Sequence, residues 1–152
     1  MFNHDQLIGI LISLAKPEIH VSRASNTNIG YRVRLRVNMR GDSTFLLWVH
    51  RTLQQKGIDS KYKEQEHKSR PRPILTIGGL LNIWKLCELI PNHIPDAKNS
   101  WRTLKEVVSI IDKGEHHTLE GLDKILSLKG EIWMVFIHPD EDDVRLLENA
   151  TF

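Results

Sequence analysis

With 152 residues, a formal net charge of +2 and 40% hydrophobic residues, the chain has the length and composition of one globular domain. Its single cysteine, Cys87, excludes an internal disulfide framework and a cysteine-rich zinc module, and it fits a reducing compartment. No apolar run reaches the roughly 18 residues that a membrane-spanning helix needs, and the first apolar run follows Asn3, His4 and Asp5 instead of a basic leader. We therefore expect a soluble intracellular protein with no membrane partner.

The first predicted helix contains the stretch Leu7 to Ala15, which reads Leu-Ile-Gly-Ile-Leu-Ile-Ser-Leu-Ala. Asn3 or Asp5 can cap this helix, and Pro17 marks its end. The stretch is apolar on every side of a helical wheel, so a helix here must be covered all round, either as an ordinary core helix or by a partner. Gly9 and Ser13 lie four residues apart and form a stripe of small side chains that another backbone could approach closely.

Two strands follow, and arginines are concentrated in them. Ile19 to Arg23 is short, whereas Tyr31 to Arg40 alternates strictly between apolar residues and arginine or asparagine. This alternation predicts one face in the core and one cationic face. Between Ile19 and Arg40 there are five arginines and no acid, which indicates an anionic partner.

The remaining elements predict an α+β domain. A helix from Asp42 or Ser43 to Lys56 is followed by strands over Lys61–Lys68 and Arg72–Ile77. Its inward side chains are expected to be Phe45, Leu46, Trp48, Val49 and Leu53. Further helices are predicted over Leu80–Ile90, Ser100–Asp112 and Thr118–Leu128. Two antiparallel hairpins with the helices on one face leave the arginine face free, and such a sheet can lie in the major groove of DNA.

The order of elements and three motifs resemble the LAGLIDADG homing endonucleases. The motifs are Leu7 to Ala15, the segment Gly114-Glu-His-His-Thr-Leu-Glu-Gly-Leu-Asp-Lys-Ile-Leu-Ser-Leu-Lys129, and Leu75-Thr-Ile-Gly-Gly with Leu89-Ile-Pro91. The resemblance implies a curved, four-stranded antiparallel sheet with helices packed on one face. It covers residues 1–130 as a DNA-binding domain and leaves 131–152 as a C-terminal extension with the acidic cluster Asp140 to Asp143.

In single-motif members of that family, the motif helices form a homodimer, and each sheet contacts half of a palindromic or pseudo-palindromic DNA site. The resemblance therefore implies a dimer interface at Leu7, Gly9, Ile10, Ser13 and Leu14. It also implies that DNA is contacted by the polar faces of the strands and their hairpin, namely by Ser22, Arg23, Arg32, Arg34, Arg36, Lys61, Lys63, His67, Arg70 and Arg72.

The end of the motif departs from the family. Family enzymes end the motif helix with an acidic residue and a glycine, and that carboxylate binds a divalent metal shared across the two active sites. Here Leu14 stands at the position of the acid and Ala15 at that of the glycine. Leucine has no oxygen to offer Mg²⁺. Glu18 could supply the acid only if the helix continued through Pro17, and Lys98 lies in a loop where family members often carry a basic residue near the scissile phosphate.

We therefore expect a sequence-specific double-stranded DNA-binding protein that has lost cleavage, with a regulatory or other DNA-bound role and no cofactor. The alternatives are an active endonuclease that uses Mg²⁺, an RNA-binding intron maturase, or a domain whose arginines bind an acidic protein. His116, His117 and Glu120 have the residue types of metal ligands, but capping near Thr118 explains them better. The acidic cluster could hold a cation, and it could also fold back on the basic sheet and compete with DNA.

Overall fold

The computed structural model describes residues 1–94, 100–128 and 135–137. Along the chain, the elements are α1 (His4–Leu14), β1 (Lys16–Arg23), β2 (Tyr31–Arg40), α2 (Ser43–Gln55), β3 (Lys61–Lys63), β4 (Ile74–Gly78), α3 (Leu80–Leu89), α4 (Ser100–Asp112), the 3-10 turn η1 (Glu115–His117), α5 (Leu119–Leu128) and β5 (Val135–Ile137). The predicted order of helices and hairpins is confirmed up to α5. Lys98 and the acidic cluster lie outside the described residues.

The strands form one sheet in the order β3-β4-β2-β1-β5. The first four strands pair antiparallel, as expected, and β2 pairs with β1 on one side and β4 on the other. The short β5 adds a parallel fifth strand beside β1, with Ile19 opposite Val135. The sequence analysis did not predict this strand, which lies within the stretch assigned to the C-terminal extension.

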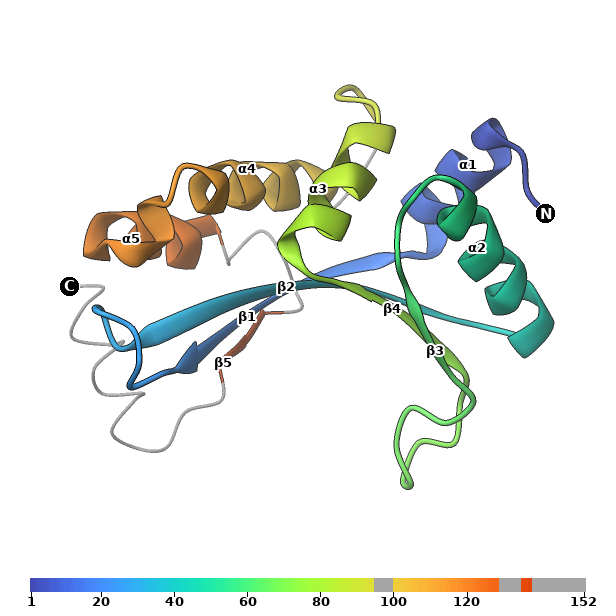
Figure 1. The fold of residues 1–152 in the computed structure, drawn as a ribbon, viewed down its shortest axis with the longest axis horizontal. Coiled ribbons are helices and arrows are strands. Elements are labelled where there is room, and N and C mark those ends of the chain that lie inside the picture. The colour runs from blue at the N-terminus through green and yellow to red at the C-terminus, as the bar shows by residue number, and fades with distance from the viewer. Residues whose placement is uncertain (95–99, 129–134, 138–152) are drawn as a thin grey trace.

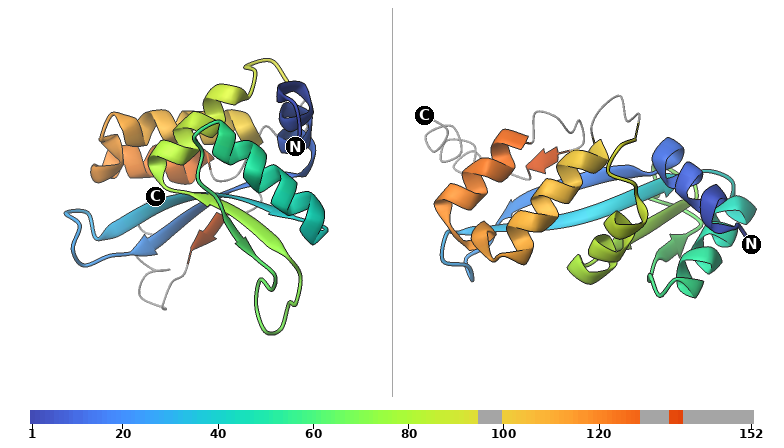
Figure 2. Two further views of the ribbon diagram at one scale, coloured as in Figure 1. Left: turned by 45° about the vertical axis from the view of Figure 1, so that its right-hand side comes forward. Right: turned by 90° about the horizontal axis from the view of Figure 1, so that it is seen from above.

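The helices lie on one side of the sheet, and the loop between β3 and β4 projects from the other side (Figure 1). Seen from above, α4 and α5 lie over the β1–β2 hairpin, and α1 and α2 lie near the other end of the sheet (Figure 2). A core of apolar side chains fills the space between the layers, and it includes Ile19, Val37, Leu53, Leu75 and Leu104, each at 0% exposure. Among the described residues, one face of the sheet is thus covered by helices and the opposite face is not.

Helix α2 begins at a side-chain cap and packs on the core through one face. The Asp42 carboxylate caps it by accepting hydrogen bonds from the backbone N–H groups of Thr44 and Phe45, at 3.1 and 3.4 Å. Its core face carries Leu46, Val49 and Leu53, all wholly buried. The prediction that Trp48 points inward is wrong, because its side chain is 44% exposed.

Trp48 lies instead at the edge of the core, where it meets the N-terminus. The Phe2 ring packs edge-on against both Trp48 and Phe45, with centroids 5.6 Å apart in each pair. Phe2 also donates its backbone N–H to the Thr52 hydroxyl at 3.2 Å. These contacts hold the start of the chain, and hence α1, against α2.

The β3–β4 hairpin is less regular than the sequence predicts. Strand β3 has three residues instead of the eight expected over Lys61–Lys68, because the rest of that segment is polar and has no buried face to hold it. Strand β4 begins at Ile74, directly after Pro73, since proline cannot donate a ladder hydrogen bond. Most of the hairpin is therefore a long connection between two short strands.

Cys87 is a core residue, as expected: it is 7% exposed, and burial raises the pKa of its thiol to about 12. Within the described ranges, no helix is long and apolar enough to cross a bilayer.

Candidate nucleic-acid interface

The sheet face turned away from the helices carries rows of cationic and polar side chains. In the β1–β2 register, Glu18 lies opposite Arg36, His20 opposite Arg34, and Ser22 opposite Arg32. Strand alternation places these residues on one face, because the intervening Ile19, Val21, Leu35 and Val37 are buried in the core. We call this surface, with Lys61 and Lys63 of β3, the basic face.

The basic face is hollowed. It borders a cavity of about 850 Å³ whose lining includes six cationic side chains. These are Arg34, Arg36, Arg40, Lys61, Lys63 and Arg70. Arg34 and Arg36 are exposed to solvent, and β1 to β4 all contribute to the cavity or its rim. The strand periodicity that predicted a cationic face thus corresponds to a continuous surface in the folded chain.

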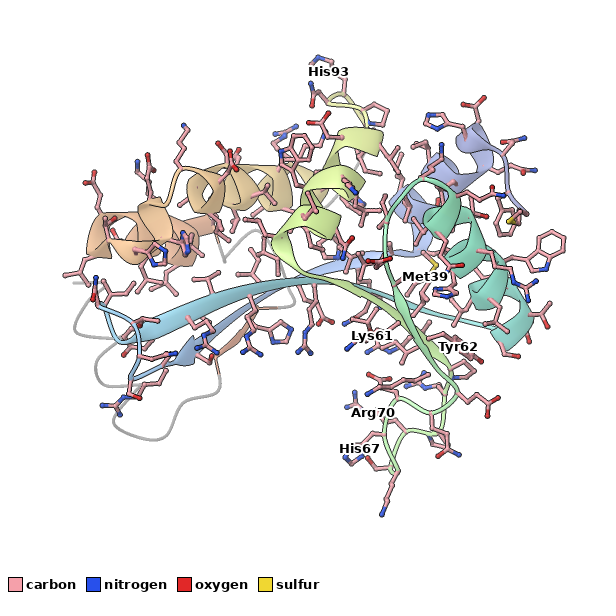
Figure 3. The ribbon with its side chains drawn as sticks, viewed as in Figure 1. Met39, Lys61, Tyr62, His67, Arg70 and His93 are labelled. Carbon is pink, nitrogen blue, oxygen red and sulfur yellow. The ribbon has the colours of Figure 1, made fainter. Side chains whose placement is uncertain are left out.

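The remaining predicted contacts come from the β3–β4 hairpin. Lys61, Arg70 and His67 follow one another down this hairpin on the side away from the helices (Figure 3). The tip is a tight turn in which His67 and Arg70 exchange backbone hydrogen bonds of 3.2 and 2.9 Å. Arg72 is exposed on the returning segment. Arg23, the last residue of β1, is exposed opposite Tyr31.

An ion pair that the sequence analysis did not predict joins the sheet to this hairpin. The Arg40 guanidinium donates through Nε to Glu66 Oε2 at 2.9 Å and through Nη2 to Glu66 Oε1. The Arg40 hydrogen bond is the main cause that lowers the pKa of the Glu66 carboxyl, and Glu66 in turn raises the pKa of Arg40. No sequence pattern indicates this pair, because its partners are 26 residues apart and Glu66 lies in an irregular loop.

Two polar pairs lie deeper in the basic face. The Thr76 hydroxyl donates to Asn38 Oδ1 at 2.9 Å and links β4 to β2. Glu18, only 4% exposed, lies 3.1 Å from His20 Nε2. Glu18 belongs to β1 and not to the helix, because α1 ends at Leu14 and Ala15 has extended backbone angles. The condition under which Glu18 would act as the acid at the end of the motif helix is therefore not met.

The end of α1 does not fit a divalent metal site. Leu14 is 47% exposed at this end and offers no oxygen ligand. Among the described residues, there is no cluster of three or more histidine, cysteine, aspartate or glutamate side chains that could hold a metal ion. The rings of His116 and His117 lie 3.8 Å apart at the start of α5, where the Thr118 hydroxyl accepts a hydrogen bond from the Gly121 N–H at 3.0 Å.

Helix α1 covers the core with one face and leaves the other face open. Leu7 and Leu11 are wholly buried in the protomer's own core, so Leu7 is not accessible to a partner. Gly9 and Ser13 are exposed with Leu14, and Ile10 is partly buried. A Cβ atom added at Gly9 would meet nothing within 4 Å. Among the described residues, the side of α1 that carries this stripe is thus exposed.

Searches with this chain find its fold but no close sequence relative. No protein-family model matches it, and neither does any curated protein. Its structure is similar to the homing endonuclease I-TnaI (TM-score 0.76, 19% identity, 98% of both chains covered) and to the archaeal intron-encoded homing endonuclease I-Vdi141I in complex with DNA (TM-score 0.75, 13% identity, 97% of this chain and 95% of that one). It also matches the meganuclease I-SmaMI bound to uncleavable DNA (TM-score 0.78, 18% identity, 98% of this chain).

These similarities define the fold. Over nearly its whole length, the chain has the α+β fold of the LAGLIDADG homing endonucleases, which confirms the resemblance seen in the sequence. The chain matches almost the full length of I-TnaI and I-Vdi141I. It spans only about half the length of I-SmaMI and of a further structural neighbour, the LAGLIDADG meganuclease I-CpaMI. Its length therefore corresponds to one copy of the fold, as expected for a single motif.

Proposed function

We propose that this protein binds double-stranded DNA sequence-specifically through its basic face and does not cleave it. The observation that carries the proposal is the exposed arginine row of β2 on the helix-free side of the sheet, in a fold whose neighbours I-Vdi141I and I-SmaMI have been captured on DNA. The curved strands would lie along the major groove, where arginine bonds bidentately to guanine. Contacts with phosphates would come from Lys61, Lys63 and the hairpin cations.

Two protomers would bind together on a palindromic or pseudo-palindromic site. The open face of α1 supports this part of the proposal, because Gly9 and Ser13 leave room for the same helix of a second copy. A two-fold interface of this kind would place the two basic faces along one duplex. With four or more phosphate contacts per protomer, affinity would fall steeply as salt rises.

The loss of cleavage is proposed from the residues at the end of α1. Leu14 cannot hold Mg²⁺, and Glu18 is engaged by His20 within β1. A regulatory or other DNA-bound role follows for a protein that binds without cutting. The opposing hypothesis, an active endonuclease that uses Mg²⁺ with Glu18 as its acid and Lys98 near the scissile phosphate, makes a distinct prediction. Incubation of the protein with its selected duplex and Mg²⁺ would then give double-strand breaks that Glu18→Gln abolishes.

The experiment is selection of duplexes from a random pool, followed by affinity measurements on the recovered site. Changing Arg34 and Arg36 together to glutamine should weaken specific binding at least about ten-fold, because each bidentate base contact contributes roughly 1–3 kcal/mol of discrimination. The matched control changes Arg51 and Arg102 to glutamine. This removes the same charge from exposed positions on helices α2 and α4 and should have little effect.

Three outcomes would contradict the proposal. Equal losses in the two double variants would mean that the basic face is not the binding surface. Preference for structured RNA over duplex DNA would favour an intron maturase instead. No salt-sensitive binding to either nucleic acid would favour an acidic protein partner.

A further inference from the structure

The β3–β4 hairpin has little regular structure to hold it. Strand β3 pairs with β4 through only three residue pairs, from Lys61 opposite Thr76 to Lys63 opposite Ile74. Beyond them, ten residues run out to the tip and back, and within this segment backbone hydrogen bonds join Glu66 to Arg72 and His67 to Arg70. The position of the hairpin affects the proposed binding directly, because it carries four cations that would contact DNA, namely Lys61, Lys63, Arg70 and Arg72.

Arg40 ties this segment to the sheet. It is the last residue of β2, and its two-point ion pair with Glu66 reaches across the basic face to the base of the tip. The two side chains are only 26% and 18% exposed, so the pair is partly shielded from water. A planar guanidinium that meets both carboxylate oxygens fixes the orientation as well as the distance of its partner.

Glu66 also changes the charge that the surface presents. Arg70 and Arg72 interact electrostatically with it as well as Arg40. While Arg40 is bonded to Glu66, two of its five N–H donors are occupied and its positive charge is offset, so its attraction for a phosphate is weaker. An acid within a DNA-binding surface opposes binding to any duplex, whereas a fixed hairpin favours binding to one sequence.

We propose that Glu66 is a positioning residue for specificity: it holds the β3–β4 hairpin in place through Arg40 and weakens that arginine's attraction for DNA phosphates. The protein thereby binds non-cognate DNA less tightly and discriminates better among sites. This inference rests on the proposed DNA-binding function and deepens it. The geometry requires both partners, since neither residue alone fixes the hairpin.

Substitutions of Glu66 and of Arg40 separate the effect of the hairpin's position from the effect of charge. Glu66→Gln frees Arg40 and removes a negative charge, so affinity for non-cognate duplex should rise and its dependence on salt should steepen by about one counterion. The ratio of cognate to non-cognate affinity should fall about five-fold or more. Arg40→Gln breaks the same pair without freeing a cation, so the ratio should fall while non-cognate affinity does not rise.

The matched control is Glu64→Gln, which removes the same charge from an exposed position on the same hairpin. It should raise affinity for both duplexes alike and leave their ratio unchanged. The charge-swapped double variant, Arg40→Glu with Glu66→Arg, can re-form the pair and should restore part of the ratio. Fluorescence anisotropy on the selected site and on a scrambled duplex, from 50 to 300 mM KCl, measures all of these quantities.

Amide hydrogen exchange of residues 64–72 in the protein without DNA gives an independent measurement. Exchange should speed up in Glu66→Gln and in Arg40→Gln but not in Glu64→Gln. If Glu66→Gln matches Glu64→Gln in both exchange and affinity ratio, the inference is overturned while DNA binding stands. If the wild-type protein binds no duplex at all, the proposed function and the inference are both overturned.

Discussion

At the scale of single residues, two helical glycines have opposite surroundings. Gly9 lies on the open face of α1, with no atom within 4 Å of the position that a Cβ would take. Gly121 is buried in the first turn of α5, where a Cβ would lie 1.9 Å from the backbone oxygen of Glu115. Neither glycine has a positive φ. Packing, and not backbone conformation, therefore distinguishes the two sites.

The same substitution should consequently have opposite effects at these sites. Gly9→Ala should stabilise the monomer by about 0.5–1 kcal/mol, because alanine loses less backbone entropy in a helix. Gly121→Ala should destabilise it by about 1–3 kcal/mol, because the 3-10 turn must move away from α5. Urea unfolding at a concentration where the chain is monomeric measures both values. A stabilising Gly121→Ala would show that the turn does not pack on α5 in this way.

At the scale of elements, the Arg40–Glu66 pair joins the end of β2 to the β3–β4 hairpin, in addition to the pairing of β2 with β4. The hydrogen bond from Arg40 lowers the pKa of Glu66, and the electrostatic interactions with Arg40, Arg70 and Arg72 act in the same direction. A carboxyl group whose pKa is lower in the folded than in the unfolded chain stabilises the fold above its unfolded pKa. That stabilisation disappears as the pH falls through the lowered value.

The difference in unfolding free energy between the wild-type protein and Glu66→Gln should therefore depend on pH. It should be largest near about pH 6, where Glu66 is ionised in both states, and should shrink as the pH falls below the pKa of the unfolded carboxyl and then through the lower pKa of the folded one. Urea unfolding of both proteins across this range measures the difference. A difference that does not change with pH would mean that the carboxylate makes no stabilising ion pair.

At the scale of the whole molecule, a helix layer on one side of the sheet leaves two surfaces exposed among the described residues. They are the basic face of the sheet, opposite the helices, and a stripe of small or apolar residues on α1, which lies at the edge of the helix layer (Figure 1). The stripe holds Gly9, Ser13 and the half-exposed Leu14, while the opposite face of α1 packs into the core through Leu7 and Leu11. A helix with this distribution gains from a second apolar surface.

Dimer formation through α1 should be sensitive to side-chain size at Gly9. Gly9→Leu fits the monomer, because the space around Gly9 is open, but it would separate two helices that pack closely there. We expect the variant to bind the selected duplex as a monomer, whereas the wild-type protein binds as a dimer. Sedimentation velocity of the protein with and without DNA measures this.

The control for that experiment is Gln54→Leu, which adds an exposed leucine to α2 instead. It should leave the stoichiometry unchanged. Dimerisation that persists in Gly9→Leu would place the interface on another surface.

Much of the architecture could be predicted from periodicity and end signals. The alternation from Tyr31 to Arg40 predicts both the β2 strand and the face that its arginines occupy, because side chains of a strand alternate whatever the partner strand is. Asp42, Gly114 and Thr118 indicate helix ends, because capping uses neighbouring backbone groups. The stripe of Gly9 and Ser13 is visible for the same reason, since four residues make about one helical turn. All of these features are set over a few consecutive residues.

The contacts between side chains of different elements were decided by the tertiary structure alone. The pairing of β2 with β4 and of β4 with β3 brought Arg40 within reach of Glu66. The position of the N-terminus determined that Trp48 packs on Phe2 at the surface instead of in the core. These contacts depend on how elements that are far apart in the sequence pack together. No repeating spacing in the sequence indicates them. Composition and pattern therefore predicted the cationic face of the sheet and the small-residue stripe of α1, whereas the Arg40–Glu66 ion pair required the fold.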